Sequence, residues 1–117
     1  MEYATYGGCP REIDWDTISP SALVYFEVNV SSTGTGEVRL CDESAVVPLF
    51  VIPISEPYMT PKRAVMPAYM FSGRKCYHVE IGGTVGQRHS CYGAMLCIKY
   101  PERARRGSRF CRIQKVS

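Results

Sequence analysis

The stretch VYFEVNV, residues 24–30, carries the clearest structural signal in this sequence of 117 residues. Apolar side chains occupy positions 24, 26, 28 and 30, whereas Glu27 and Asn29 between them are polar. Alternation with a period of two is typical of a β-strand that has one face against a core and the other face in water. Residues 24–30 therefore predict a half-buried strand.

The sequence that follows continues this pattern. Residues 31–41 contain two glycines that allow a turn and then alternate again, which predicts a hairpin with the first strand. Residues 46–54 are apolar and β-branched, but Pro48 and Pro53 each remove a backbone donor, so an edge or bulged strand is expected. Further prolines predict a long ordered loop over residues 55–66.

The last third of the chain is strand-like as well. Residues 77–81 and 92–100 alternate on either side of a glycine-containing turn, and residues 110–113 add a further short stretch. The total is six or seven short strands separated by Gly and Pro. This pattern predicts an all-β fold, either a small antiparallel sandwich or a jelly-roll-like barrel.

The composition is that of an ordinary globular protein. Apolar residues make up 45% of the chain and charged residues 21%, which excludes a disordered or collagen-like protein. No uncharged apolar stretch approaches the roughly 18–20 residues that span a bilayer, so no membrane span is expected. The length fits one domain, which we divide into an irregular N-terminal segment (1–21), a β-sandwich domain (22–100) and a basic C-terminal tail (101–117).

Charge is distributed unevenly along the chain. Residues 101–117 contain six basic side chains and one acid, whereas residues 1–100 contain eight basic and ten acidic side chains. Clustered arginines bind phosphate and carboxylate groups through fork-shaped hydrogen bonding. The alternative is a solvated tail that keeps the protein in solution. The candidate nucleic-acid contacts are Arg103, Arg105, Arg106, Arg109, Arg112 and Lys115.

The cysteines leave two interpretations open. Six cysteines are present, and no two have the C-x-x-C spacing, so neither a zinc-ribbon nor a thioredoxin-type site is expected. Three disulfides would fit an oxidising compartment, as would the glycosylation sequon at 29–31. The first residues lack the basic start and the apolar run of a signal peptide. We therefore expect free thiols.

A mirror-image sequence in the last third suggests a site. A hairpin that pairs Cys76 with Cys91 also pairs His78 with His89, and its two-residue turn falls at 83–84. Opposed Cβ atoms lie about 5 Å apart, and two thiolates with two imidazoles are competent zinc ligands. A disulfide between Cys76 and Cys91 is the second interpretation, and a coincidental palindrome is the third.

The same region contains residue types used in RNA cleavage. His78, Glu80, Arg88 and His89 could supply an acid, a base and a cation for attack by the 2′-hydroxyl, as in small fungal guanyl-specific ribonucleases. Their spacing does not match that family. We therefore expect no enzymatic activity and no cofactor.

Residues 69–101 carry a resemblance to a known family. They contain the aromatic-x-Gly entry Phe71-Ser72-Gly73, a strand at 77–82, and an apolar strand after Gly93 that ends at Tyr100-Pro101. This succession resembles picornavirus-like jelly-roll capsid proteins. Phe71 stands where that family usually has tryptophan, and the chain ends before several strands of a full jelly roll.

The resemblance implies a non-enzymatic structural or assembly protein, a capsid-like subunit located in a virion or the host cytoplasm. Its β surface would contact other protein subunits in a homo- or hetero-oligomer, and its basic tail would contact RNA. The alternative is a secreted, disulfide-stabilised binding or effector domain, which would be extracellular.

Overall fold

The alternating stretches form β-strands in the computed structural model, which describes residues 2–8, 12–43, 48–100, 108–112 and 114–115. The strands are β1 (Glu2–Gly8), β2 (Ile13–Asp14), β3 (Leu23–Ser32), β4 (Gly36–Asp42), β5 (Phe50–Ile54), β6 (Thr60–Pro67), β7 (Arg74–Lys75), β8 (Tyr77–Gly83), β9 (His89–Lys99), β10 (Ser108–Arg112) and β11 (Gln114–Lys115). Two short 3-10 helices are η1 (Trp15–Thr17) and η2 (Ala68–Met70). Within these residues, no helix has the length and apolar character needed to cross a membrane.

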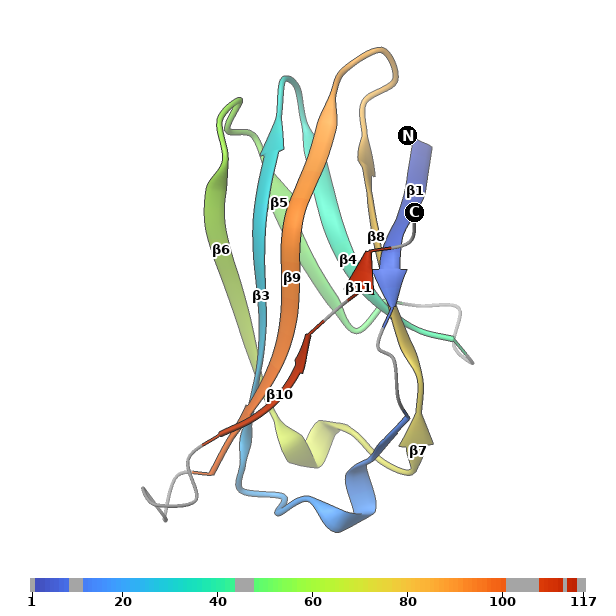
Figure 1. The fold of residues 1–117 in the computed structure, drawn as a ribbon, viewed down its shortest axis with the longest axis vertical. Helices are drawn as coiled ribbons and strands as arrows, with labels where there is room; N and C mark the ends of the chain where they lie inside the picture. The colour runs from blue at the N-terminus through green and yellow to red at the C-terminus, as the bar shows by residue number, and fades with distance from the viewer. Residues whose placement is uncertain (1, 9–11, 44–47, 101–107, 113, 116–117) are drawn as a thin grey trace.

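Two antiparallel sheets face each other and form a sandwich (Figure 1). The first, which we name the β8 sheet, has the strand order β11-β1-β8-β4-β5. The second, the β3 sheet, has the order β10-β9-β3-β6. A small third sheet pairs β2 with β7. The predicted all-β sandwich is confirmed.

The core lies between the two sheets and contains the side chains that the alternation of residues 24–30 identified. Val24, Phe26, Val28 and Val30 are each at most 3% exposed. The ring of Phe26 lies 5.7 Å from that of Phe50 on the facing sheet. The apolar face of β3 therefore holds the two layers together.

Trp15 closes one end of the core. It is 3% exposed, its ring stacks on Phe71 with centroids 4.4 Å apart, and its indole N–H donates to the Tyr77 hydroxyl at 2.6 Å. The helical turn that presents it is capped by Asp14, whose carboxylate accepts from the backbone N–H of Asp16. The polar end of the indole is thus satisfied inside an apolar environment.

Both predicted hairpins are wrong, although their strands exist. β3 belongs to one sheet and β4 to the other, and β8 and β9 are separated in the same way. The connecting loops, 33–35 and 84–88, therefore cross between the sheets. They are joined by hydrogen bonds from Thr33 N to Arg88 O at 3.0 Å and from Thr84 N to Thr35 O at 3.0 Å.

The two ends of the chain also differ from the expectation. Residues 2–8, placed in an irregular segment, form β1, and the basic tail contributes β10 and β11. β1 pairs with β8 and β10 pairs with β9, because those two strands would otherwise present unpaired backbone groups at a sheet edge. β11 then pairs with β1, so the tail joins both sheets.

One edge strand of each sheet contains proline. β5, with Pro53, is one edge of the β8 sheet, as predicted for residues 46–54, of which 46–47 lie outside the described residues. β6 is one edge of the β3 sheet, where a loop was expected, and it contains Pro61 and Pro67. An edge strand tolerates proline because one row of its N–H groups has no partner strand.

Candidate functional site

The four residues of the predicted zinc set do not come together. That site and the Cys76–Cys91 disulfide both required β8 and β9 to be hydrogen-bonded neighbours, and the two strands lie in different sheets. Cys76 and Cys91 carry separate thiols. A period of two determines which face a side chain takes but does not determine the partner strand. His78 and His89, which the mirror-image sequence predicted to be paired, therefore lie in different sheets.

His89 fastens the two crossing loops. Its Nε2 lies 3.0 Å from the carbonyl oxygen of Thr84, which can only accept, so Nε2 carries the proton. In the neutral imidazole, Nδ1 then accepts from the Ser32 hydroxyl, whose oxygen lies 2.8 Å away. A serine next to a histidine is the arrangement of a nucleophile and its base. Ser32 is 1% exposed and also accepts from Gly34 N, so this pair holds the loops rather than meeting a substrate.

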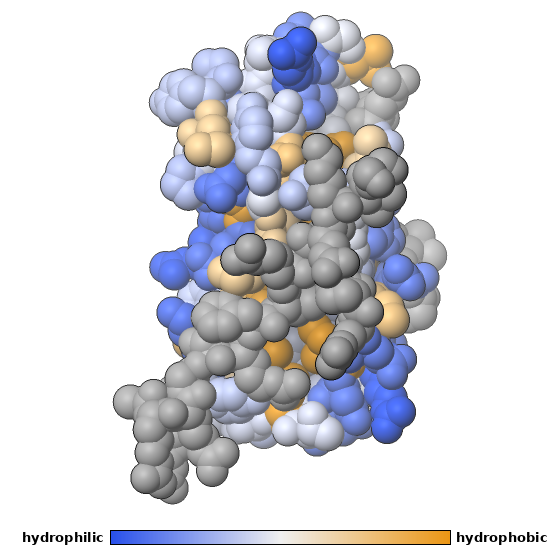
Figure 2. All heavy atoms as spheres, in the orientation of Figure 1, coloured by the Kyte–Doolittle hydropathy of each residue, from blue (hydrophilic) through white to orange (hydrophobic). Residues whose placement is uncertain are grey.

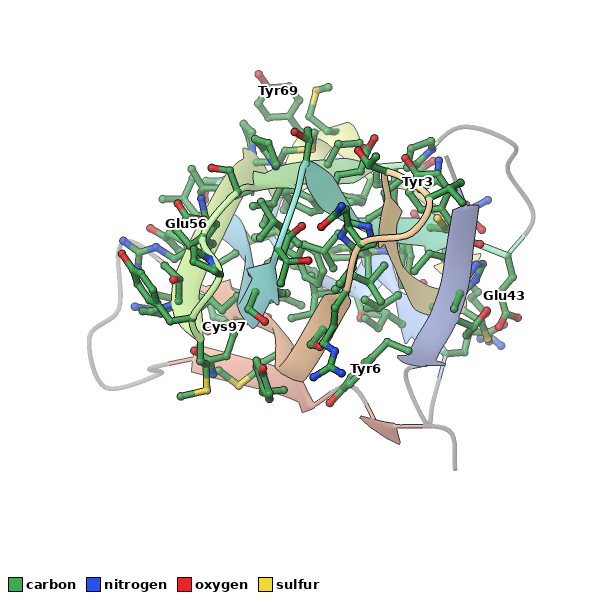
Figure 3. The ribbon with its side chains drawn as sticks, turned by 90° about the horizontal axis from the view of Figure 1, so that it is seen from above. Tyr3, Tyr6, Glu43, Glu56, Tyr69 and Cys97 are labelled. Atoms are coloured by element: carbon green, nitrogen blue, oxygen red, sulfur yellow. The ribbon has the colours of Figure 1, made fainter. Side chains whose placement is uncertain are left out.

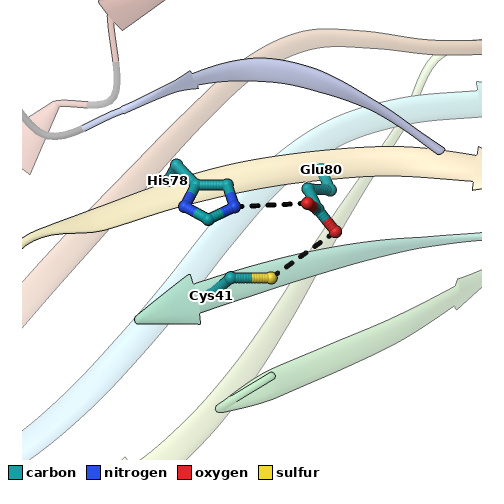
Figure 4. Close-up of side chains that lie close together, drawn as sticks. All are labelled: Cys41, His78 and Glu80. Atoms are coloured by element: carbon teal, nitrogen blue, oxygen red, sulfur yellow. Dashed lines mark hydrogen bonds and ion pairs between the residues drawn. The ribbon is translucent and has the colours of Figure 1, made fainter. Parts of the chain in front are cut away.

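A second polar group lies on the outer face of the β8 sheet (Figure 4). The register places Cys41 of β4 directly opposite His78 of β8, and Glu80 lies two residues further along β8. Glu80 Oε2 is 3.2 Å from His78 Nε2, and Glu80 Oε1 is 3.7 Å from Cys41 Sγ. We refer to these three residues as the β4–β8 cluster.

Arg39 and Tyr3 border the β4–β8 cluster. Arg39 forms an ion pair with Oε1 of Glu80, and its guanidinium carbon lies 3.7 Å from the centroid of the Tyr3 ring. The Tyr3 hydroxyl donates to Glu37 at 2.6 Å. The buried Arg39 Nε has no hydrogen-bond partner among the described residues. Arg39 therefore holds Glu80 from one side and leaves its other oxygen to His78.

The electrostatics assign protonation states to this cluster. Burial raises the pKa of Glu80, but hydrogen bonds and charges from Arg39 and His78 outweigh it, so the pKa is lowered and Glu80 is a carboxylate at neutral pH. Burial, followed by the charge of Glu80, raises the pKa of Cys41 to about 11. Cys41 is therefore a protonated thiol at neutral pH, which argues against a nucleophilic cysteine.

We expect Cys41 to resist alkylation of the native protein. At pH 8 a pKa of about 11 leaves a thiolate fraction roughly 100-fold lower than that of an unperturbed thiol. Iodoacetamide labelling followed by peptide mass spectrometry measures this, with the same protein in guanidinium as the control. Labelling of native Cys41 at the denatured rate would contradict the assignment.

The outer face of the β3 sheet combines an aromatic ring with two cations. The guanidinium carbon of Arg63, from β6, lies 4.9 Å from the ring centroid of Tyr25. The ammonium nitrogen of Lys99, from β9, lies 5.2 Å from the same centroid. We refer to Tyr25, Arg63 and Lys99 as the cationic face. Hydrophilic side chains gather over β6 and β3 in this view of the molecule (Figure 2).

A groove of about 580 Å³ adjoins the cationic face. Arg63 belongs to both, and the rings of Tyr6 and Tyr92 line the groove. Tyr6 comes from β1 and lies on the side of the molecule that also carries Cys97 (Figure 3). Tyr92 is 56% exposed. The lining thus offers flat aromatic surface beside positive charge, although Glu27 adds one carboxylate.

The predicted nucleic-acid contacts are divided by the structure. Those outside the described residues are Arg103, Arg105 and Arg106. Those with a described backbone are Arg109 and Arg112 in β10 and Lys115 in β11. The register pairs Arg112 with Met95 of β9, the strand that also carries Lys99. Of the basic end, β10 therefore forms one edge of the sheet that bears the cationic face, whereas β11 pairs with β1 in the other sheet.

Sequence reasoning found part of these surfaces. Of the residues considered for RNA cleavage, the structure joins His78 and Glu80, whereas Arg88 and His89 belong to the crossing loop and the start of β9. The roles of Cys41 and Tyr25 were missed, because their partners lie on other strands.

Comparison of the chain with models of known protein families, with curated proteins and with solved structures gives no significant match.

Proposed function

We propose that the protein is a non-enzymatic assembly module that binds single-stranded RNA on the outer face of the β3 sheet. The observation that carries this proposal is the position of Tyr25 between Arg63 and Lys99, on the sheet whose edge strand β10 belongs to the arginine-rich end. The resemblance of residues 69–101 to capsid proteins supports the same role.

The chemistry of the cationic face suits a single strand. Tyr25 is half-buried, whereas Tyr92 of the adjoining groove is 56% exposed. Stacking of an aromatic ring on a base contributes about 1–3 kcal/mol per base with little dependence on sequence. Arginine and lysine neutralise phosphates and release counterions, so affinity falls as salt rises. The acidic excess of residues 1–100 lies away from the arginine-rich end in the sequence, and this asymmetry favours approach of a polyanion to β10.

The assembly role requires protein contacts through side chains. The prolines of β5 and β6 oppose association by strand addition at those edges. Tyr69 and Met70 of η2 are 68% and 60% exposed and offer an apolar contact instead. The location in a virion or the host cytoplasm, and the alternative of an extracellular effector domain, stay predictions.

Fluorescence anisotropy with a labelled single-stranded RNA tests the proposal. We expect the double variant Arg63→Gln/Lys99→Gln to bind roughly tenfold more weakly and to lower the slope of log affinity against log salt by about 1–2. Sedimentation of the same samples should show several copies on one RNA, as an assembly role requires.

The matched control changes cations on another part of the surface. Arg74 carries a side chain that is 71% exposed and pairs with Asp14. Arg88 lies in the crossing loop and is exposed. The variant Arg74→Gln/Arg88→Gln removes the same charge and should bind RNA as the unmodified protein does. Equal losses in the two double variants, or binding that salt does not weaken, would contradict a specific cationic face.

A further inference from the structure

We propose that Cys41, His78 and Glu80 form a binding site for a divalent transition-metal ion, zinc by preference, with one coordination position open to solvent. The site lies on the outer face of the β8 sheet, whereas the cationic face belongs to the β3 sheet. This inference is therefore independent of the proposed RNA binding.

The candidate ligand atoms lie near the separations that a tetrahedral site requires, and the two measured contacts reach different oxygens of Glu80. Zinc binds sulfur at about 2.3 Å and nitrogen or oxygen at about 2.0–2.2 Å, which places its ligands about 3.3–3.6 Å apart. Cys41 Sγ is 3.7 Å from Glu80 Oε1, and His78 Nε2 is 3.2 Å from Glu80 Oε2. All three ligand atoms lie within 4.8 Å of one another. Small side-chain rotations therefore suffice to close the site.

The backbone fixes this geometry more firmly than a loop could. Cys41 and His78 are cross-strand partners on adjacent strands, and Glu80 shares their face because it lies two residues from His78. β8 is held on both sides, by β1 and by β4. A site built on such strands is preorganised, so little chain entropy is lost when the ion binds.

The donor set selects the kind of metal. Calcium and magnesium prefer oxygen ligands alone, whereas a thiolate with an imidazole and a carboxylate suits zinc and cobalt. On binding, the Cys41 thiol releases its proton to solvent as the bond from sulfur to the metal forms. The proton that His78 Nε2 donates to Glu80 also leaves Nε2, the ring keeps one proton on Nδ1, and the freed Nε2 lone pair binds the metal. Thiolate and carboxylate together supply two negative charges toward a divalent ion. Arg39 already pairs with Glu80 Oε1, so Oε2, the oxygen that faces His78, is the one left for the ion.

The fourth position faces solvent. The side chains of His78 and Glu80 are each 25% exposed, whereas Cys41 is 9% exposed. Three protein ligands and one exchangeable position distinguish such a site from a closed structural zinc site with four protein ligands. The bound ion would link β4 to β8 and could still take an external ligand.

Cobalt titration of the metal-free protein tests this site. We expect one cobalt per chain and a thiolate-to-cobalt charge-transfer band in the near ultraviolet. Cys41→Ser should abolish the band, and Glu80→Gln should weaken binding at least about tenfold. The control Cys76→Ser removes another thiol, from the zinc set first predicted by the sequence, and should leave the band and the affinity unchanged.

X-ray absorption of the zinc-loaded unmodified protein provides a measurement that needs no variant. One sulfur and one imidazole among the zinc neighbours are expected. Two sulfurs, no sulfur, or a charge-transfer band that disappears in Cys76→Ser but persists in Cys41→Ser would overturn the proposal. So would the absence of stoichiometric cobalt binding by the unmodified protein.

Discussion

Replacement of Gly83 by alanine should destabilise the protein by more than about 3 kcal/mol, because the new methyl group has no space. A Cβ at Gly83 would lie 2.3 Å from the carbonyl oxygen of Thr35 and 2.5 Å from the Cα of Gly36. Both are backbone atoms, so no side-chain rotation relieves the clash. Gly83 pairs with Gly36 at the end of β8 and β4, and these strands would have to separate there.

Urea unfolding followed by far-ultraviolet circular dichroism measures this effect. The midpoint of Gly83→Ala should fall by at least about 1 M. Gly93→Ala in β9 is the matched control, because its Cβ would meet only Asn29 Nδ2 at 3.8 Å. That variant should stay within about 0.5 kcal/mol of the unmodified protein. Similar urea midpoints for the two variants would show that the backbones of β8 at Gly83 and β4 at Gly36 are not as close together as described.

Trp15→Ala should cost about 3–5 kcal/mol, the usual loss when a large buried ring is removed. The indole stacks on Phe71 and meets the edge of Tyr77, so its removal opens a cavity between two rings. Trp15→Phe keeps the stacking but loses the indole N–H that donates to Tyr77, and should cost about 1–3 kcal/mol.

Chemical unfolding by circular dichroism again provides the measurement, since Trp15 is the one tryptophan of the chain and fluorescence is lost with it. Tyr69→Ala, which removes a ring that is 68% exposed, is the control and should change stability little. If Trp15→Ala is no more destabilised than Tyr69→Ala, Trp15 does not anchor the end of the core.

The faces of the strands could be predicted from the sequence, whereas their neighbours could not. Alternation identified Val24, Phe26, Val28 and Val30 as core, and each is buried. The same pattern is satisfied whether β3 pairs with β4 or with β9, because a period of two contains no information about the partner. β1 was missed because it contains two glycines and a register shift between Thr5 and Gly7.

The candidate sites were likewise predictable within one strand but not between strands. The i, i+2 spacing of His78 and Glu80 was visible and does place them on one face. Cys41 joins them only through the register of β4 against β8. The cationic face is formed by residues from three strands of one sheet, so no local sequence motif could have predicted it. These residues are Tyr25, Arg63 and Lys99. Sites assembled across strands require the sheet order to be known first.

The strand order has a consequence for how the chain reaches its fold. β4–β5 and β9–β10 join strands that follow one another, but β1 pairs with β8 and β3 with β9, across most of the sequence. Loops that long close slowly, which is typical of β-sandwiches that fold in milliseconds to seconds. During synthesis on the ribosome, β1 emerges first and has no partner until β8 has been made. Among the described strands, β1 would thus wait for the longest stretch of synthesis before its first partner is available.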